Sequence, residues 1–190
     1  MKKITTRDKI INSAHKLFYE KGFNGTSIDD ILKDAGLNKG SLYHLFQGKK
    51  EVLLAVIEER IAYNLEQKYK DIATVENPLR FLKQKLLTTD TFDFKHGCAL
   101  NNLVQEMSPV DEDIAKALWK VYNALEDYYF LALREENMSE YEKKSVAKMM
   151  VATVEGAIMA AKAAQDKEPY LQIVEQLFCL IPMHPHKKKG

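Results

Sequence analysis

The residues best suited to a specific chemistry lie in a short segment that ends at Lys49. Four side chains there combine basic and hydroxyl groups that suit base edges and phosphates, and they fall on one arc of an expected helix: Lys39, Ser41, Tyr43 and His44. The opposite face is apolar, with residues at i, i+3 and i+4: Leu42, Leu45 and Phe46. A helix with one polar, basic face and one anchoring face is typical of a recognition helix that enters the major groove of DNA.

Thr26 and Lys49 each lie at the expected N-terminus of a helix. Exposed amides and the helix dipole make such ends natural phosphate sites. We therefore predict that these two residues hold the DNA backbone on either side of the recognition helix.

Each of these residues also has a simpler interpretation. Thr26 can serve only as a helix cap, and Lys39 and Lys49 can be ordinary solvated charges. Tyr43 can be a partly buried core residue, and His44 an ordinary surface residue. The joint pattern, more than any single residue, favours nucleic-acid binding.

Two short helices joined by a glycine turn position these side chains, in a helix-turn-helix at about residues 27–46. The first helix of the chain is predicted from Thr5 or Thr6 to Gly22. Thr26 and Ser27, followed by acidic residues, resemble a capping box that opens the second helix. Gly36 ends this helix, and Asn38 caps the third.

The remaining sequence also predicts helices, and sustained strand alternation is absent. A long fourth helix is expected from about residue 49 to residue 72. The expected fold is all-α with about nine helices. A helix-turn-helix domain at 1–50 precedes a larger helical domain at 51–183 and a disordered tail at 184–190.

Composition limits the classes of protein that fit. Residues 1–50 carry ten Lys and Arg against five Asp and Glu, a net charge of +5, whereas residues 51–190 carry −4. This basic segment is expected to face a polyanion. No apolar run is long enough for a membrane span, and no signal peptide is recognisable, so we expect a cytoplasmic protein.

Metal and cofactor sites are not expected. The two cysteines, Cys98 and Cys179, lie 81 positions apart without a CxxC pattern, so we expect free thiols. His184 and His186 in the tail lack partner ligands and make a poor metal site. We therefore predict no metal, no cofactor and no enzymatic activity.

The N-terminal segment resembles the DNA-binding domain of TetR-family transcriptional regulators. The resemblance covers about residues 5–60 and is carried by Gly22-Phe23, Thr26-Ser27-Ile28, Ile31, Ala35-Gly36-Leu37, Gly40, Leu42-Tyr43, Phe46 and Lys49. Asn38, Leu45, Gly48 and Lys50 depart from the usual pattern, which leaves the base preference open. The resemblance implies DNA contacts from Thr26, Lys39, Ser41, Tyr43, His44 and Lys49.

The resemblance also implies a ligand-responsive homodimer, most often a repressor on a palindromic operator, that pairs through its last two helices at about 140–181. The sequence adds a surface of small residues: Val154, Gly156, Ala157, Ala160, Ala161, Ala163 and Ala164. An apolar stripe follows on the final helix: Leu171, Val174, Leu177, Phe178 and Ile181. Alternatively, both sets belong to the core of one chain.

Aromatic and methionine residues of the middle helices could line an apolar effector site. The residues proposed for it are Tyr63, Phe81, Phe94, Asn101, Met107, Trp119, Tyr122 and Met150. A small apolar or aromatic effector would suit such a lining. Most of these side chains also fit a plain hydrophobic core.

Gly97, Cys98 and Asn102 resemble a Gly-Cys-x-x-x-Asn element of one branch of the family. In the first turn of a helix, Cys98 would have a lowered thiol pKa and could sense oxidants or electrophiles, although a buried, inert cysteine is the simpler alternative. A thiol enzyme using His96, Cys98 and Glu106 is a remote alternative, because no glycine elbow or base-orienting spacing supports it. A helical adaptor that binds only protein is another alternative. The operator, effector and regulated genes stay open.

Overall fold

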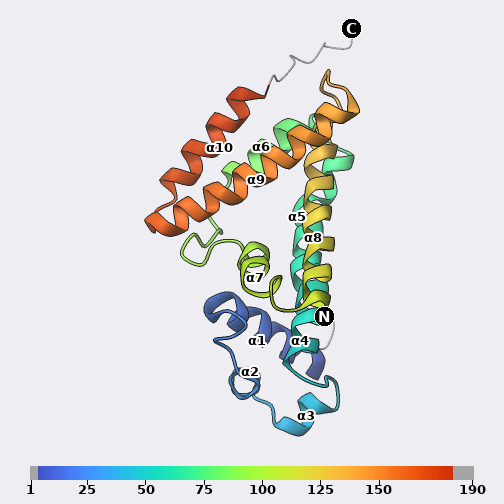
Figure 1. Cartoon of the computed structure of the whole chain (residues 1–190), viewed down its shortest axis with the longest axis vertical. Helices are drawn as coiled ribbons and strands as arrows, with labels where there is room; N and C mark the ends of the chain where they lie inside the picture. Colours follow the sequence, from blue (N-terminus) through green and yellow to red (C-terminus); the bar gives the residue numbers. More distant parts are fainter. Residues whose placement is uncertain (1–3, 182–190) are drawn as a thin grey trace. The chain divides into compact units, whose positions relative to one another are not determined.

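The computed structural model describes residues 4–181, and all regular structure within them is helical. The α-helices are α1 (Thr6–Lys21), α2 (Ile28–Ala35), α3 (Lys39–Tyr43), α4 (Lys49–Val56), α5 (Tyr63–Tyr69), α6 (Pro78–Leu87), α7 (Ala99–Met107), α8 (Glu112–Ala132), α9 (Glu140–Ala164) and α10 (Glu168–Leu180). A π-helical turn, η1 (Ile57–Ala62), joins α4 to α5, and a 3₁₀ turn, η2 (Lys70–Ala73), follows α5. Because α4, η1 and α5 run on as one helix, the described residues form nine continuous helices (Figure 1), which confirms the all-α prediction.

The chain divides into two compact units. The first contains the described residues up to Glu66 together with Ala99–Tyr122, and the second contains Gln67–Cys98 and the residues from Asn123 onward. The first unit takes in residues 51–66, α7 and the first half of α8 as well as the N-terminal helices. The domain division near residue 50 stays a prediction. The predicted tail, 184–190, lies outside the described residues.

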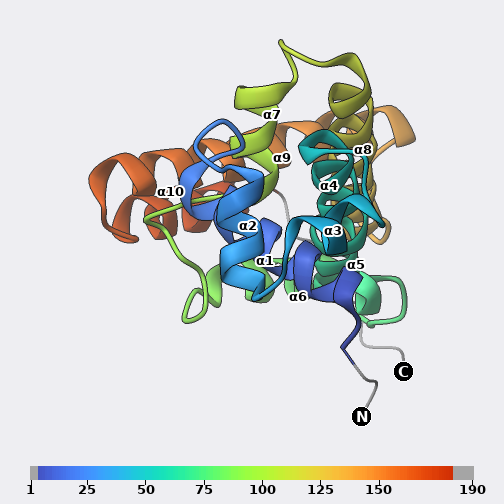
Figure 2. The same ribbon diagram turned by 90° about the horizontal axis from the view of Figure 1, so that it is seen from below.

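Local capping explains the helices at the start of the first unit. Ser27 and Asp30 form a reciprocal capping box at α2, in which the Ser27 Oγ accepts from the Asp30 N–H. Gly36 ends α2 in the left-handed region at φ 65°, and the Asn38 side chain accepts from the Ser41 N–H to start α3. These three predictions are confirmed. Figure 2 shows α2 and α3 beside α1, against which both helices pack.

The long fourth helix is interrupted by the π turn η1, which was not predicted. Two charged residues of η1 reach α1: Glu59 pairs with Arg7, and the Arg60 Nε donates to the Asn12 Oδ1 over 2.7 Å. Arg60 also lies 3.5 Å from Asp8. The π turn is therefore fixed to the first helix by polar contacts.

The second unit is built on the antiparallel neighbours α9 and α10, which lie side by side in Figure 1 and contact α6 through α10. Its core contains three tyrosines, Tyr69, Tyr129 and Tyr170, of which Tyr129 is 1% exposed. The Tyr170 hydroxyl donates to the Leu86 carbonyl over 2.8 Å. Burial raises the pKa of both Tyr129 and Tyr170 well above the usual value for tyrosine.

Two helix ends differ from the predictions. The helix predicted to start at about Gly97 begins at Ala99, and the long helix predicted to end at Glu136 stops at Ala132. Gly97 has φ 78°, a left-handed conformation that interrupts a helix at that point. Among the described residues, no helix is both long enough and apolar enough to cross a membrane.

Candidate nucleic-acid interface

Helix α3 presents a polar face to solvent and an apolar face to the core. Leu42 is fully buried and Phe46 is 3% exposed, whereas the Tyr43 side chain is 56% exposed. Lys39 and His44 are also exposed, so three of the four predicted base-reading side chains face outward. The arrangement leaves one side of a short helix available to a groove.

The fourth predicted side chain, Ser41, is half-buried and takes part in the cap of α3. Its hydroxyl donates to the Asn38 Oδ1 over 3.2 Å. Lys39 forms an exposed ion pair with Asp29 of α2 at 3.0 Å, and the hydrogen bond to Asp29 raises the pKa of Lys39. Because an exposed pair of this kind is worth little, Lys39 can exchange Asp29 for a nucleic-acid acceptor at small cost.

Thr26 lies immediately before the Ser27 cap, and its side chain is only 1% exposed. Its hydroxyl is the donor to both the Gly22 carbonyl, at 2.8 Å, and the Leu17 carbonyl, at 3.2 Å. The side chain thus binds the end of α1 to the turn before α2. In this position it faces protein carbonyls, and a direct phosphate contact stays a prediction.

Lys49 opens α4 and points back onto the same turn. Its Nζ donates to the Phe23 carbonyl over 2.8 Å and to the Thr26 carbonyl over 2.9 Å. The ammonium also lies 4.1 Å from the centre of the Phe23 ring, within the range of a cation–π contact. The ammonium therefore has three partners within the protein, and a phosphate would have to displace some of them.

A residue that the sequence did not single out for this interface, Glu106, holds the other side of the turn. Near the end of α7, its carboxylate accepts from the Phe23 N–H over 2.9 Å and from the Asn24 N–H over 2.8 Å. Gly22, at φ 77°, lies so close that an added Cβ would be 3.0 Å from the Glu106 Oε2. No local pattern could have identified Glu106, because more than eighty residues separate it from its partners.

A second contact joins α4 to the loop after α7 and to the first turn of α8. The Lys50 Nζ lies 2.8 Å from Asp111 and 2.7 Å from Asp113. The hydrogen bonds to these two carboxylates raise the pKa of Lys50, and Lys50 holds the pKa of Asp111 below its usual value. Lys50, which departs from the usual family pattern, thus has acidic partners within the same unit.

The residues predicted to line an effector site are divided between the two units. Tyr63, Asn101, Met107, Trp119 and Tyr122 belong to the first, and Phe81, Phe94 and Met150 to the second. Phe94, Met107 and Met150 are buried, while Tyr63 and Trp119 are exposed. An effector site composed of this set stays a prediction.

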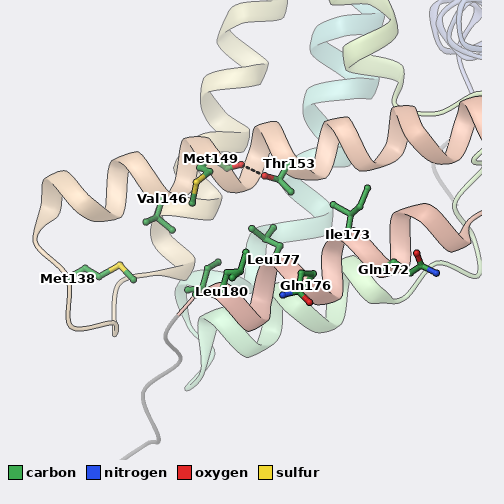
Figure 3. Close-up of a pocket in the computed structure, with 10 residues that line it drawn as sticks. Met138, Val146, Met149, Thr153, Gln172, Ile173, Gln176, Leu177 and Leu180 are labelled. Atoms are coloured by element: carbon green, nitrogen blue, oxygen red, sulfur yellow. Dashed lines mark hydrogen bonds between the residues drawn. The ribbon is translucent and has the colours of Figure 1, made fainter.

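The second unit has an apolar groove of about 410 Å³ between α9 and α10 (Figure 3). Its lining residues are Met138, Val146, Met149, Thr153, Gln172, Ile173, Gln176, Leu177, Leu180 and Ile181. Met149 is 55% exposed and Leu180 is 73% exposed, so the groove presents apolar surface to solvent. The groove lies on the two helices predicted to form a dimer, and it shares Leu177 and Ile181 with the predicted apolar stripe.

Most of the predicted dimer stripes are buried within their own chain. The buried members are Val154, Ala157, Ala161, Val174, Leu177, Phe178 and Ile181. These residues pack within their own chain. Helical periodicity identifies an apolar face without identifying its partner, and pairing of two chains through the last two helices stays a prediction. Gly156 and Ala163 are exposed or half-exposed, as are Ala160 and Leu171, so part of the stripe stays accessible.

Cys98 is half-buried and precedes α7 by one residue, so it does not lie in the first turn as predicted. The three residues of the remote enzyme alternative have other surroundings. The His96 Nδ1 lies 2.6 Å from an Asp93 oxygen, and Glu106 binds two backbone amides. The two tail histidines lie outside the described residues, and within residues 4–181 no three metal-ligating side chains gather.

Comparisons with known proteins agree with the geometry of this interface. Residues 10–56 match the family described as bacterial regulatory proteins, tetR family, and residues 72–176 match the C-terminal domain of LmrA/YxaF-like transcriptional regulators. The chain is 30% identical over 190 residues to the HTH-type transcriptional regulator YxaF of Bacillus subtilis (strain 168), covering 97% of both chains. An HTH-type regulator from the lacX 3' region of Lactococcus lactis subsp. lactis is 32% identical over 187 residues, 93% of this chain and 91% of the relative.

A solved structure extends the likeness to the fold. The crystal structure of a regulatory protein TetR from Rhodobacter sphaeroides superimposes with a TM-score of 0.76 at 27% identity. The superposition covers 89% of this chain and 95% of that one. Both halves of the sequence and the arrangement of its helices therefore match the same kind of protein.

Proposed function

Because the chain belongs to the TetR family of helix-turn-helix transcriptional regulators, we propose that it is a cytoplasmic repressor that binds a palindromic operator as a homodimer. The observation that carries the DNA-binding part is the exposed polar face of α3 above a buried apolar face. Lys39, Tyr43 and His44 are proposed to contact base edges and phosphates in the major groove. Ser41 contributes from the first turn of the helix.

We assign Thr26 and Lys49 a different role from the one their positions suggested. Both side chains bind carbonyls of the turn that precedes α2. Their contribution to DNA binding is to fix the entry of α2, which in turn supports α3. A direct phosphate contact by Lys49 would require it to leave the Phe23 and Thr26 carbonyls.

The proposed dimer uses the accessible faces of α9 and α10. A second copy of the chain is the occupant that suits the groove. Met149 and Leu180 line the groove and are exposed in one chain, so pairing about a two-fold axis would cover the same apolar surface on both chains. Gly156 and Ala163 on the same helix permit close approach of a neighbouring helix. The two helix-turn-helix domains of such a dimer, one from each chain and here called its heads, would then read two half-sites that are whole helical turns of DNA apart.

We further propose that a small apolar or aromatic effector releases the operator by favouring another arrangement of the helices. The proposal rests on family membership and on the aromatic and methionine residues of the middle helices. A panel of such compounds, tested by thermal shift and then by operator release, would examine it. Tight binding without any change in operator affinity would contradict it.

Selection of DNA from a random library by the full-length protein tests the DNA-binding proposal. A two-fold-symmetric sequence is expected, with an affinity that falls steeply as the salt concentration rises. Lys39→Ala and Tyr43→Ala should weaken binding roughly tenfold or more. The control Lys33→Ala, which removes an exposed charge from α2, should have a much smaller effect.

Two outcomes of this selection would contradict the proposal. Recovery of no preferred sequence, with binding that hardly depends on salt, would favour the protein-binding adaptor. Equal loss of affinity in Lys39→Ala and Lys33→Ala would mean that α3 has no special role.

A further inference from the structure

The turn between α1 and α2 is held from two sides by groups of opposite charge. The Glu106 carboxylate of α7 binds the N–H groups of Phe23 and Asn24, and the Lys49 ammonium of α4 binds the carbonyls of Phe23 and Thr26. Both groups that Phe23 offers to hydrogen bonding are therefore engaged, its N–H by α7 and its carbonyl by α4. All of these residues lie in one compact unit.

Helix α7 is well placed to transmit a change to this turn. It begins at Ala99, the residue at which the chain enters the first unit after leaving the second at Cys98. Glu106 lies two turns further along this helix. A shift of α7 must move the turn with it or break both amide bonds to Glu106, because a carboxylate holding two amides leaves little freedom for sliding.

The local backbone is built to admit this carboxylate. Gly22 has a positive φ, and any Cβ there would approach both oxygens of Glu106 at 3.0 and 3.2 Å. The turn leads directly into the Ser27 cap of α2, so its position sets where α2 and then α3 begin. The carboxylate therefore acts on the entry to the helix-turn-helix rather than on its DNA-contacting face.

We propose that Glu106 is the positioning residue that couples α7 to the DNA-binding helices, so that it determines the spacing at which the two heads of the regulator read their half-sites. This inference rests on the proposed function. According to this inference, Glu106 makes no contact with DNA. Its removal changes the accepted spacing between half-sites without changing the sequence of either half-site.

The test compares full-length Glu106→Gln with wild type and with the control Glu112→Gln. Glutamine keeps the length of the side chain but offers one acceptor oxygen to two amide donors. Glu112 undergoes the same chemical change in the same unit, but its side chain is 92% exposed and pairs only with Lys116 at 3.8 Å. A second variant, Glu106→Asp, keeps the charge but is too short to hold both amides.

Two measurements are made on each protein. The first is amide hydrogen exchange at Phe23 and Asn24, which needs no DNA. The second is selection from libraries in which one half-site is fixed and the spacing varies, together with affinity for a single half-site. Glu106→Gln should exchange faster at both amides, accept several spacings and lose about 5- to 150-fold in affinity at the wild-type spacing, the usual range of allosteric coupling.

Affinity for the single half-site should stay at the wild-type value, a result that general destabilisation of the head would not give. Glu106→Asp should lie between Glu106→Gln and wild type, and Glu112→Gln should match wild type. Unchanged exchange, or unchanged spacing preference and affinity, would overturn the inference. If wild type selects no DNA, the proposed function fails, and exchange at Phe23 and Asn24 still decides whether Glu106 holds the turn.

Discussion

Substitution of Lys49 by methionine separates a role in protein structure from a role in phosphate binding. Methionine retains most of the apolar stem but removes the ammonium, which donates to two carbonyls at 2.8 and 2.9 Å and lies over the Phe23 ring. A hydrogen bond to a charged group contributes about 1.5–3 kcal/mol, so two such bonds set an upper limit of roughly 3–6 kcal/mol. Water reaches part of this turn and can replace some of the missing donors.

We therefore expect Lys49→Met to lower the free energy of unfolding by about 2–4 kcal/mol. For a chain of this length, that corresponds to a fall in Tm of roughly 4–16 °C. Thermal and urea denaturation at one fixed protein concentration measure the loss, because a dimer's stability depends on concentration. The control is Lys50→Met, whose exposed ion pairs are worth about 0–1 kcal/mol.

The salt dependence of DNA binding provides the second measurement. If Lys49 acts on the turn, the slope of log K against log salt concentration should stay at the wild-type value in Lys49→Met. If Lys49 instead neutralises a phosphate, its removal should reduce the slope by about 0.9 for each phosphate that it neutralised. Unchanged stability together with a reduced slope would refute the reasoning, since Lys49 would then be a phosphate ligand with little structural role.

Three further predictions concern other parts of the molecule. Leu180→Glu should convert the proposed dimer to monomers in light scattering without loss of helix, because Leu180 is 73% exposed in one chain and a charge buried in the interface is costly. A dimer that persists in this variant would exclude this surface, and Val110→Glu is the control. Above about pH 10, the unfolded chain releases tyrosine protons that the folded chain retains, so the free energy of unfolding should fall as the pH rises. Tyr170→Phe should reduce the slope of the free energy of unfolding against pH by up to about 1.4 kcal/mol per pH unit. An equal slope in the variant would mean that the pKa of Tyr170 does not change on folding. Cys98→Ser should match wild type in operator release by a thiol oxidant, because Cys98 is half-buried and only part of its side chain is accessible to the oxidant. Loss of release in the variant alone would favour the redox alternative.

The parts of the fold that could be predicted depend on neighbours within a few residues. The Ser27 capping box, the Gly36 end of α2 and the Asn38 cap are each encoded within about four positions, and all three were confirmed. The inward direction of Leu42 and Phe46 follows from helical spacing and was also confirmed. Local chemistry therefore defines the recognition helix and its exposed face.

The parts that could not be predicted depend on partners distant in the sequence. Nothing near Glu106 indicates that it binds the amides of Phe23 and Asn24. The bonds from Lys49 to Phe23 and Thr26 arise only once α4 has packed against α1. For the same reason, spacing alone could not distinguish the core face of α9 from its accessible face.

The π turn at Ile57–Ala62 has a consequence for how this chain should be aligned with others. A π turn accommodates one more residue than an α-helical turn while the flanking helices continue along the same axis. A related sequence that is one residue shorter in this region can therefore preserve both flanking helices by forming a regular α-helix. Single-residue gaps here would record a change in helical winding rather than the loss of a loop, and Arg60, which contacts Asn12, would be the residue whose equivalent is displaced.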